Sequence, residues 1–220
     1  MIRQETLDFL SGLSQHNEKG WFDARRSQYE AARDNLIQVV DRVIEEIATF
    51  DDTLGGVVAR QSLFRINRDV RFSNNKDPYK TNMGAFVSRG GRNSPFAGYY
   101  VHIEPGKSFA GGGSYMPPAD VLQKIRAHID HEGPRLREII SDPAYVAVYG
   151  TLEGEALRTA PKGYPKDHPE IDLLRMKSFV GTRTLTDAQL TSPDLVHRLA
   201  EDFRALYPLI DFLNEAIDTN

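Results

Sequence analysis

Two patterns of apolar residues divide the chain. In the first fifty residues, apolar side chains recur every three or four positions, which is the period of an amphipathic helix. Leu36, Val40, Val43 and Ile47 follow this spacing and predict a long helix over 28–49. A shorter amphipathic stretch predicts a helix over 5–16, and Asn17 is a candidate cap for the helix that follows.

From residue 57 to residue 115, β-branched and aromatic residues are separated by Gly, Pro, Asn and Ser, which is typical of strands and turns. The candidate strands are 57–61, 63–68, 84–88, 99–104 and 108–112. We expect the last two to pair, because Glu104-Pro105-Gly106-Lys107 between them has proline and glycine where a tight turn needs them.

The remaining chain is again mostly helical in pattern. A helix is expected to begin at Pro117 and Pro118 and to be interrupted at Gly133-Pro134, and a short segment follows over 145–149. A late strand is predicted over 178–184. Thr186 and Gln189 form a capping-box pattern, and the closing helix after residue 194 should break or kink at Pro208.

The order of these elements predicts the fold class α+β, with a mostly antiparallel central sheet flanked by N-terminal and C-terminal helices. At 220 residues the chain is long enough to bury a core, and we expect a single domain over 1–220 because no linker divides it. With 40% hydrophobic and 26% charged residues, the composition argues against a fibrous or disordered protein.

Several function classes are excluded or disfavoured by composition. The absence of cysteine excludes disulfides, thiol nucleophiles and cysteine-ligated metals. No secretory signal or membrane-length apolar run is present, so we expect a soluble, cytoplasmic protein without a membrane partner. The pI of about 5.9 makes nucleic acid an unlikely general partner. No motif predicts a metal site or a cofactor.

Charge is distributed very unevenly. The segment from Arg60 to Arg92 holds eight Lys and Arg against Asp69 and Asp77, a net charge of +6, so the rest of the chain carries −10 of the total of −4. A local gathering of cations in an acidic chain indicates a site for an anion.

In a strand over 64–72, Arg65 and Arg71 would share one face, where guanidinium groups suit phosphate or carboxylate. Arg68 would fall on the apolar face, so a bulge or a strand end near Asn67 is the alternative there. The polar loop after this strand adds Lys76, Tyr79 and Lys80 to the predicted ligand-binding residues. The structural alternative is that Arg65 and Arg71 pair with Asp69 or with acidic residues of the flanking helices and that the lysines are solvated.

A second basic loop over 162–168 is followed by Lys177. If it folds back over the first basic segment, Lys162 and Lys177 would complete the cationic pocket, and His168 would be the candidate catalytic acid or base. The alternative is an ordered, proline-rich connection with surface lysines and a capping histidine. His102 shares a predicted strand face with Tyr100 and Glu104, and it either lines the same cleft as Arg65 or belongs to a half-exposed structural face.

Several motifs together resemble a known family. They are FRINRDVRFSNNKDPYKTNMGAF, GYYVHIEP, GGGSYMP, PKGYPKDHP and LLRMKSF. Together they are similar to the bacterial and fungal family called domain of unknown function 2461, a family of conserved hypothetical proteins. The resemblance spans nearly the whole chain from Trp21 onward and implies one intact domain. It implies no activity, cofactor or site residue.

The residues thus support two functional hypotheses. The first is a cleft that binds a small phosphorylated or carboxylated ligand, with or without catalysis. The second is a docking module whose basic strip binds an acidic protein segment or nucleic acid. A concave site with converging cations would favour the first, and a flat strip with splayed side chains would favour the second.

Overall fold

A computed structural model describes residues 1–71 and 74–218. The fold is α+β, as predicted, with a four-stranded antiparallel sheet in the order β1-β2-β3-β4. The strands are β1 (Met83–Ser88), β2 (Gly98–Ile103), β3 (Ser108–Ser114) and β4 (Phe179–Leu185). β2 and β3 pair through the predicted turn, in which Lys107 N donates to Glu104 O at 2.9 Å.

Helices precede and follow the first three strands. Those before β1 are α1 (Gln4–Gln15), α2 (Lys19–Ala24), α3 (Arg26–Ile47), a 3₁₀ helix (Asp52–Leu54) and α4 (Ala59–Ser62). Those after β3 are α5 (Ala119–Ser141), α6 (Pro143–Tyr149), α7 (Ile171–Leu174), α8 (Asp187–Leu190) and α9 (Leu195–Asp218). The predicted helices over 5–16 and 28–49 correspond to α1 and α3.

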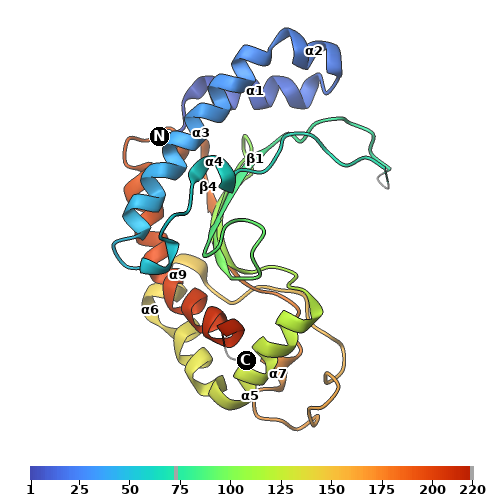
Figure 1. Cartoon of the computed structure of the whole chain (residues 1–220), viewed down its shortest axis with the longest axis vertical. Coiled ribbons are helices and arrows are strands. Elements are labelled where there is room, and N and C mark those ends of the chain that lie inside the picture. The colour runs from blue at the N-terminus through green and yellow to red at the C-terminus, as the bar shows by residue number, and fades with distance from the viewer. Residues whose placement is uncertain (72–73, 219–220) are drawn as a thin grey trace.

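One face of the sheet carries the core and the other is open. Alternate residues of the strands, such as Val87, Tyr99 and Ala110, are buried on the side of α3 and α9. Along α9, Leu199, Phe203 and Leu206 are fully buried, at the three- and four-residue spacing of a helix that packs on a sheet. In Figure 1, α3 and α9 lie along this side of the sheet. Side chains that alternate with the core residues, such as Phe86 and Tyr100, line a cavity on the opposite face.

The predicted strands over 57–61 and 63–68 are wrong. Residues 59–62 form the short helix α4, and the segment after it makes only isolated bridges, between Leu63 and Ala85 and between Asn67 and Tyr79. Leu63 and Ile66 are buried while Phe64 is 39% exposed, so burial does not alternate as it does in a strand. This segment leads into an arm, residues 64–71 and 74–82, that projects from the body in Figure 1.

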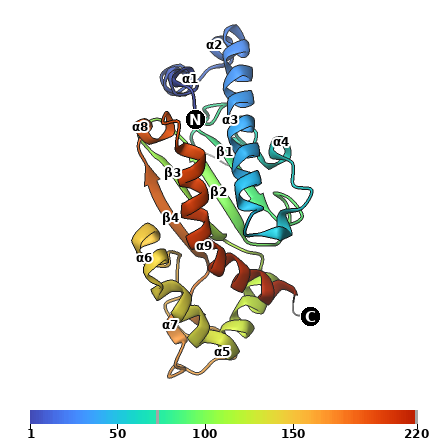
Figure 2. The same ribbon diagram turned by 90° about the vertical axis from the view of Figure 1, so that its left-hand side faces the viewer.

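The C-terminal half agrees more closely with its pattern. α5 has a non-helical residue at Glu132, beside the predicted interruption at Gly133-Pro134, and the capping box of Thr186 and Gln189 is present. α9 continues through Pro208 to Asp218, so this proline does not end the helix, although the ribbon of α9 changes direction along its length in Figure 2. Among the described residues, no helix has the length and apolar character needed to cross a membrane.

Candidate functional site

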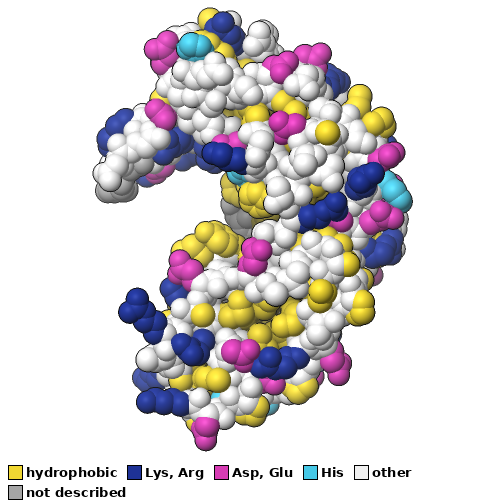
Figure 3. Space-filling view, turned by 180° about the vertical axis from the view of Figure 1, so that it is seen from behind, with side chains coloured by type: hydrophobic (Ala, Val, Ile, Leu, Met, Phe, Trp, Pro, Cys, Tyr) yellow, Lys and Arg dark blue, Asp and Glu magenta, His cyan; other side chains and the backbone are white. Residues whose placement is uncertain are grey.

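The open face of the sheet forms the floor of a large cavity, called here the sheet cavity. Its volume is about 1080 Å³, the size class of sites for small organic ligands. Phe86, Tyr100, His102 and Phe109 line its floor, and Gly111 lies on the same face without a side chain. Figure 3 shows the molecule hollowed between the arm and the part that contains α5. The sheet therefore forms the floor of a hollow between two projecting parts of the chain, with aromatic side chains on β1 to β3 and glycines 111–113 at the end of β3.

Three cations converge on one end of this cavity: Arg65 and Lys80 from the arm and Arg92 from the turn between β1 and β2. Two of them meet at one ring, because Lys80 Nζ lies 5.5 Å and Arg92 Cζ 5.0 Å from the ring centre of Phe64. We call Arg65, Lys80 and Arg92 the cation trio. Lys80 and Arg92 are thus held at one aromatic ring, and the charge of Arg65 also acts on Lys80.

The electrostatic consequence is visible at Lys80. Burial lowers the pKa of its ammonium group below the ordinary lysine value, and the charges of Arg65 and Arg92 lower it further. Over residues 1–71 and 74–218, none of the three forms an ion pair with a carboxylate. Arg92 Nε donates to the carbonyl oxygen of Gln61 at 3.3 Å, and Asp69, which pairs with Arg71, also lies in the field of Arg65. The trio therefore has no directly paired carboxylate among the described residues.

A chain of hydrogen bonds runs from the cavity floor on β2 to Glu104, the residue after this strand. Tyr100 Oη lies 3.0 Å from His102 Nδ1, and His102 Nε2 lies 3.3 Å from Glu104 Oε2. The other carboxylate oxygen of Glu104 accepts from Thr81 Oγ1 at 3.1 Å. Residues two apart in a strand point to the same face, so β2 aligns Tyr100 and His102, and Glu104 follows directly after the end of this strand. The arrangement connects a phenol, an imidazole and a carboxylate in one row.

Aromatic neighbours hold this row in place. The His102 ring stacks on Phe109 of β3, with ring centres 4.6 Å apart and an angle of 16° between the planes. Tyr100 packs edge-on against Phe64, at 6.1 Å between ring centres. Burial raises the pKa of the Tyr100 phenol above its usual value. Phe64 therefore contacts both Tyr100 and two members of the cation trio, which places the row and the cations side by side.

Of the ligand-binding residues predicted in the first basic segment, only Arg65 and Lys80 line the sheet cavity. Arg71 Nη2 pairs with Asp69 Oδ2 at 2.6 Å, which is the structural alternative foreseen for it. Lys76 Nζ donates to the Val70 carbonyl at 3.1 Å, on the exposed part of the arm. Tyr79 is 6% exposed and stacks on Phe22 with ring centres 4.1 Å apart, so it anchors the arm to the helices.

The second basic loop lies at the other end of the molecule, beside α5 and α7 (Figure 1). Lys177 Nζ pairs with Glu155 Oε2 at 2.7 Å, and Lys162 is exposed. His168 Nε2 lies 2.8 Å from Asp130 Oδ1, while its Nδ1 accepts from the Glu170 backbone at 3.0 Å. None of these residues lines the sheet cavity, and both nitrogens of His168 are engaged in holding the loop on α5.

Sequence patterns did not assign Arg92 to the site and did not identify the row of Tyr100, His102 and Glu104 as part of it. Arg92 was counted in the charged segment but not assigned to the site, because nothing in the chain from Gly90 to Pro95 indicates where this turn folds. The row of Tyr100, His102 and Glu104 was noticed through its two-residue spacing, which is the signal that identifies a shared strand face. What the spacing could not show is that this face stays uncovered.

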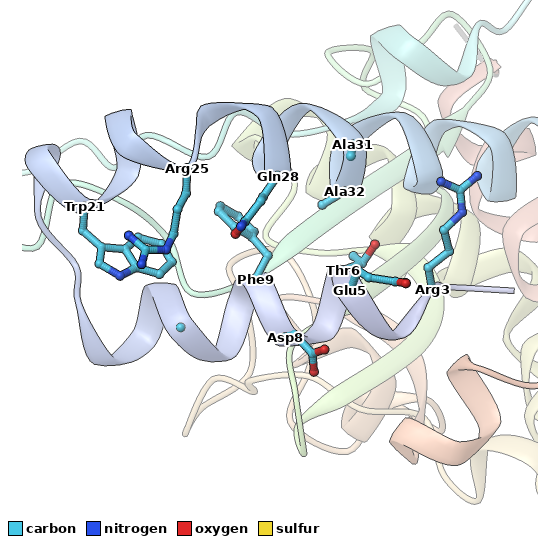
Figure 4. Close-up of a pocket in the computed structure, with 11 residues that line it drawn as sticks. Arg3, Glu5, Thr6, Asp8, Phe9, Trp21, Arg25, Gln28, Ala31 and Ala32 are labelled. Carbon is cyan, nitrogen blue, oxygen red and sulfur yellow. The ribbon is translucent and has the colours of Figure 1, made fainter.

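A second cavity of about 660 Å³ lies between α1 and α3. Figure 4 shows Trp21 and Arg25 together at one end and Arg3 at the other. The Arg25 guanidinium lies 4.4 Å from the Trp21 ring centre, and Arg3 Nη2 donates to Gln38 at 3.4 Å. Because its cations lie at opposite ends and are engaged with neighbours, this groove lacks the convergence of the sheet cavity.

The fold and the cavity define a class of protein: an α+β domain with an antiparallel sheet covered by helices on one face and open to a cation-lined hollow on the other. Residues 5–212 match the model of the family described as Conserved hypothetical protein (DUF2461), and the chain belongs to this family. No match was found among curated proteins or among solved structures.

Proposed function

We propose that the sheet cavity binds a small phosphorylated or carboxylated ligand, with its anionic group between Arg65, Lys80 and Arg92. The observation that carries this proposal is that three cations line one concave site and that none of them forms an ion pair with a carboxylate of the described residues. Two guanidinium groups offer planar pairs of N–H donors that match the oxygens of phosphate or carboxylate.

The charges of Arg65 and Arg92 repel the charge of Lys80. Lys80 carries its charge at a cost, since burial and its two cationic neighbours lower the pKa of its ammonium group. A bound anion would offset this repulsion and favour the protonated lysine. The apolar floor of Phe86, Tyr100 and Phe109 would contact the uncharged body of the ligand.

The alternative, a docking strip for an acidic segment or nucleic acid, receives less support from the geometry. Two of the arm's cations outside the cavity have acidic neighbours, since Arg71 pairs with Asp69, and Arg68 Nη1 lies 3.8 Å from Asp77 Oδ2. A third, Lys76, donates to the Val70 carbonyl, so the arm outside the cavity presents no group of cations comparable to the trio. A concave site of this size suits a small molecule better than an extended polyanion.

The proposal is tested by thermal shift with inorganic phosphate and a panel of phosphorylated and carboxylated metabolites, at constant ionic strength set with sodium chloride. We expect a rise in the melting temperature of the wild type that is lost in Arg92→Ala and Lys80→Ala. Arg71→Ala removes the same charge from the same arm outside the cavity, and it should respond as the wild type does.

Three results would count against the site as drawn. The proposal fails if no compound of the panel raises the wild-type melting temperature. It also fails if Arg92→Ala responds as the wild type does. A loss in Arg71→Ala equal to that in Arg92→Ala would move the anion from the cavity to the arm.

A further inference from the structure

The row of Tyr100, His102 and Glu104 has a defined direction of proton donation. An ionised carboxylate only accepts hydrogen bonds, so the contact between His102 Nε2 and Glu104 requires the hydrogen on Nε2. In the neutral imidazole Nδ1 is then an acceptor, and the hydrogen of the contact at 3.0 Å belongs to Tyr100 Oη. Tyr100 therefore points its proton at His102 and keeps its oxygen lone pairs for another partner.

The surroundings of the imidazole fix this arrangement. Phe109 of β3 stacks on the ring, Thr81 donates to Glu104, and Gly84 of β1 is paired with His102 across the sheet. The charged and titratable groups that line the same cavity are the cation trio, Tyr115 and Glu153. Glu153 Oε2 is engaged by Thr182 Oγ1 at 2.9 Å, on the β4 side of the cavity. Both nitrogens of His102 are thus committed, and Tyr100 Oη is the atom of the row that remains available to a ligand.

We propose that Tyr100 is a proton-transfer residue of the sheet cavity, with His102 and Glu104 as positioning and proton-accepting partners, acting on a hydroxyl group of the bound anion. This role rests on the proposed function in one respect, the placement of the ligand by the cation trio. The ligand class it implies is a phosphorylated or carboxylated compound that also carries a hydroxyl group.

The step is balanced within the site. The ligand O–H bond breaks, its electron pair stays on the ligand oxygen, and the proton forms a bond to Tyr100 Oη. At the same time the phenolic proton of Tyr100 moves to His102 Nδ1. The resulting imidazolium retains its Nε2–H bond to the Glu104 carboxylate, which stabilises the positive charge. The reverse transfer returns the proton to the ligand oxygen.

This relay can be tested without knowing the natural ligand, through the nucleophilicity of Tyr100. The probe is 4-(fluorosulfonyl)benzoate, whose carboxylate suits the cation trio. Tyr100 Oη attacks sulfur, an S–O bond forms, fluoride leaves with the S–F electron pair, and the phenolic proton passes to His102. Mass spectrometry of peptides from the intact, folded protein measures labelling at each tyrosine. Tyr115, 76% exposed on the same cavity, is the internal control.

We expect Tyr100 to be labelled faster than Tyr115, despite being the less exposed of the two. His102→Asn keeps a hydrogen-bonding amide near the position of Nδ1 but cannot take up a proton, so labelling should slow by about 100-fold. Glu104→Gln should cause a smaller loss. Tyr100→Phe removes the reactive oxygen and therefore gives the background level of labelling at this position. Unchanged melting temperatures confirm that the variants are folded.

The failures of the two proposals are distinguishable. If phosphate stabilises the wild type through the trio but Tyr100 is labelled no faster than Tyr115, or equally fast in His102→Asn, the relay is refuted and the anion site stands. If phosphate has no effect but neutral benzenesulfonyl fluoride labels Tyr100 in a His102-dependent way, the relay stands and the anion site falls.

Discussion

The side-chain amide of Asn17 hydrogen-bonds both backbone groups of Tyr79. Asn17 Nδ2 donates to Tyr79 O at 3.0 Å, and Tyr79 N donates to Asn17 Oδ1 at 3.1 Å. Asn17 was predicted to cap a helix, but it instead fixes a segment 62 residues away in the sequence. Next to this clamp, Lys80 N donates to Ile66 O at 2.8 Å, so the position of one member of the cation trio depends on the clamp.

Asn17→Ala is expected to lower both stability and anion binding. The part-buried backbone groups of Tyr79 lose their partners, at a cost of about 1–3 kcal/mol in the free energy of unfolding. Urea unfolding measures this cost, and the thermal shift with phosphate measures binding. The exposed Asn74→Ala on the arm is the control and should change neither quantity. A destabilised Asn17→Ala that keeps the full phosphate response would show that Lys80 does not depend on the clamp.

Gly84→Ala is expected to separate the relay from the anion site. A Cβ at this position would lie 2.6 Å from Tyr100 Oη, closer than any real contact, so the phenol must move away from its place over β1. The hydrogen bond to His102 should lengthen or break. We expect sulfonyl fluoride labelling at Tyr100 to fall toward that of Tyr115, while the phosphate-induced shift persists. If Tyr100 is labelled in Gly84→Ala as fast as in the wild type, the observed position of the hydroxyl group is not needed for its reactivity.

Local sequence patterns predicted most of the fold. The helices over 5–16 and 28–49, the β2–β3 hairpin and the capping box of α8 follow from short-range periodicity and turn chemistry, which act over a few residues. The strand predicted at the start of the arm was wrong because Phe64, Ile66 and Val70 have the alternating spacing that is typical of a strand. Its conformation is decided by contacts distant in sequence, with Phe22 and Asn17, and such contacts override local preference.

The candidate site was predicted less well for a related reason. The excess of cations between Arg60 and Arg92 was apparent from the sequence, but which of them line the cavity depends on the residues that each one contacts in the fold. Arg71 finds Asp69 two residues away, whereas Arg65 and Lys80 face the hollow with Arg92. The loop with Lys162 and His168 carries a similar composition, yet the contact of His168 with Asp130 holds it on α5. Composition therefore identified the basic segment, but it could not predict which of its cations line the cavity and which pair with neighbouring residues.

Arg183→Met is expected to make stability depend on pH. Arg183 on β4 pairs with Asp202 on α9, whose side chain is 7% exposed. Burial raises the pKa of Asp202 above the usual carboxyl value, although the Arg183 charge opposes this. Without Arg183 that pKa should rise further. A carboxyl group with a raised folded pKa stabilises the fold below its unfolded pKa, and this contribution is lost as the pH rises through the folded pKa.

The variant should therefore lose more stability at pH 7 than at pH 4. Since Arg183 is 27% exposed, we expect a loss of about 2 kcal/mol at pH 7, below the range for fully buried pairs. Urea unfolding from pH 4 to 7 measures it, with the exposed Arg42→Met as the control. A loss that is equal at both pH values would indicate that Arg183 acts through packing alone.

Glu215→Gln is expected to show the opposite pH dependence. Arg135 on α5 forms two contacts with Glu215 on α9, one of them 2.9 Å from Nη2 to Oε1, and this hydrogen bonding lowers the pKa of Glu215. A lowered carboxyl pKa gives stability that is present above the unfolded pKa and lost as the pH falls through the folded pKa. Both side chains are about 40% exposed, so solvent limits the loss at pH 7 to about 0.5 kcal/mol. The difference from wild type should shrink toward zero in acid, and Glu138→Gln, on the exposed side of α5, should show none at either pH. A difference that persists undiminished in acid would assign the effect to the shape of the side chain and not to its charge.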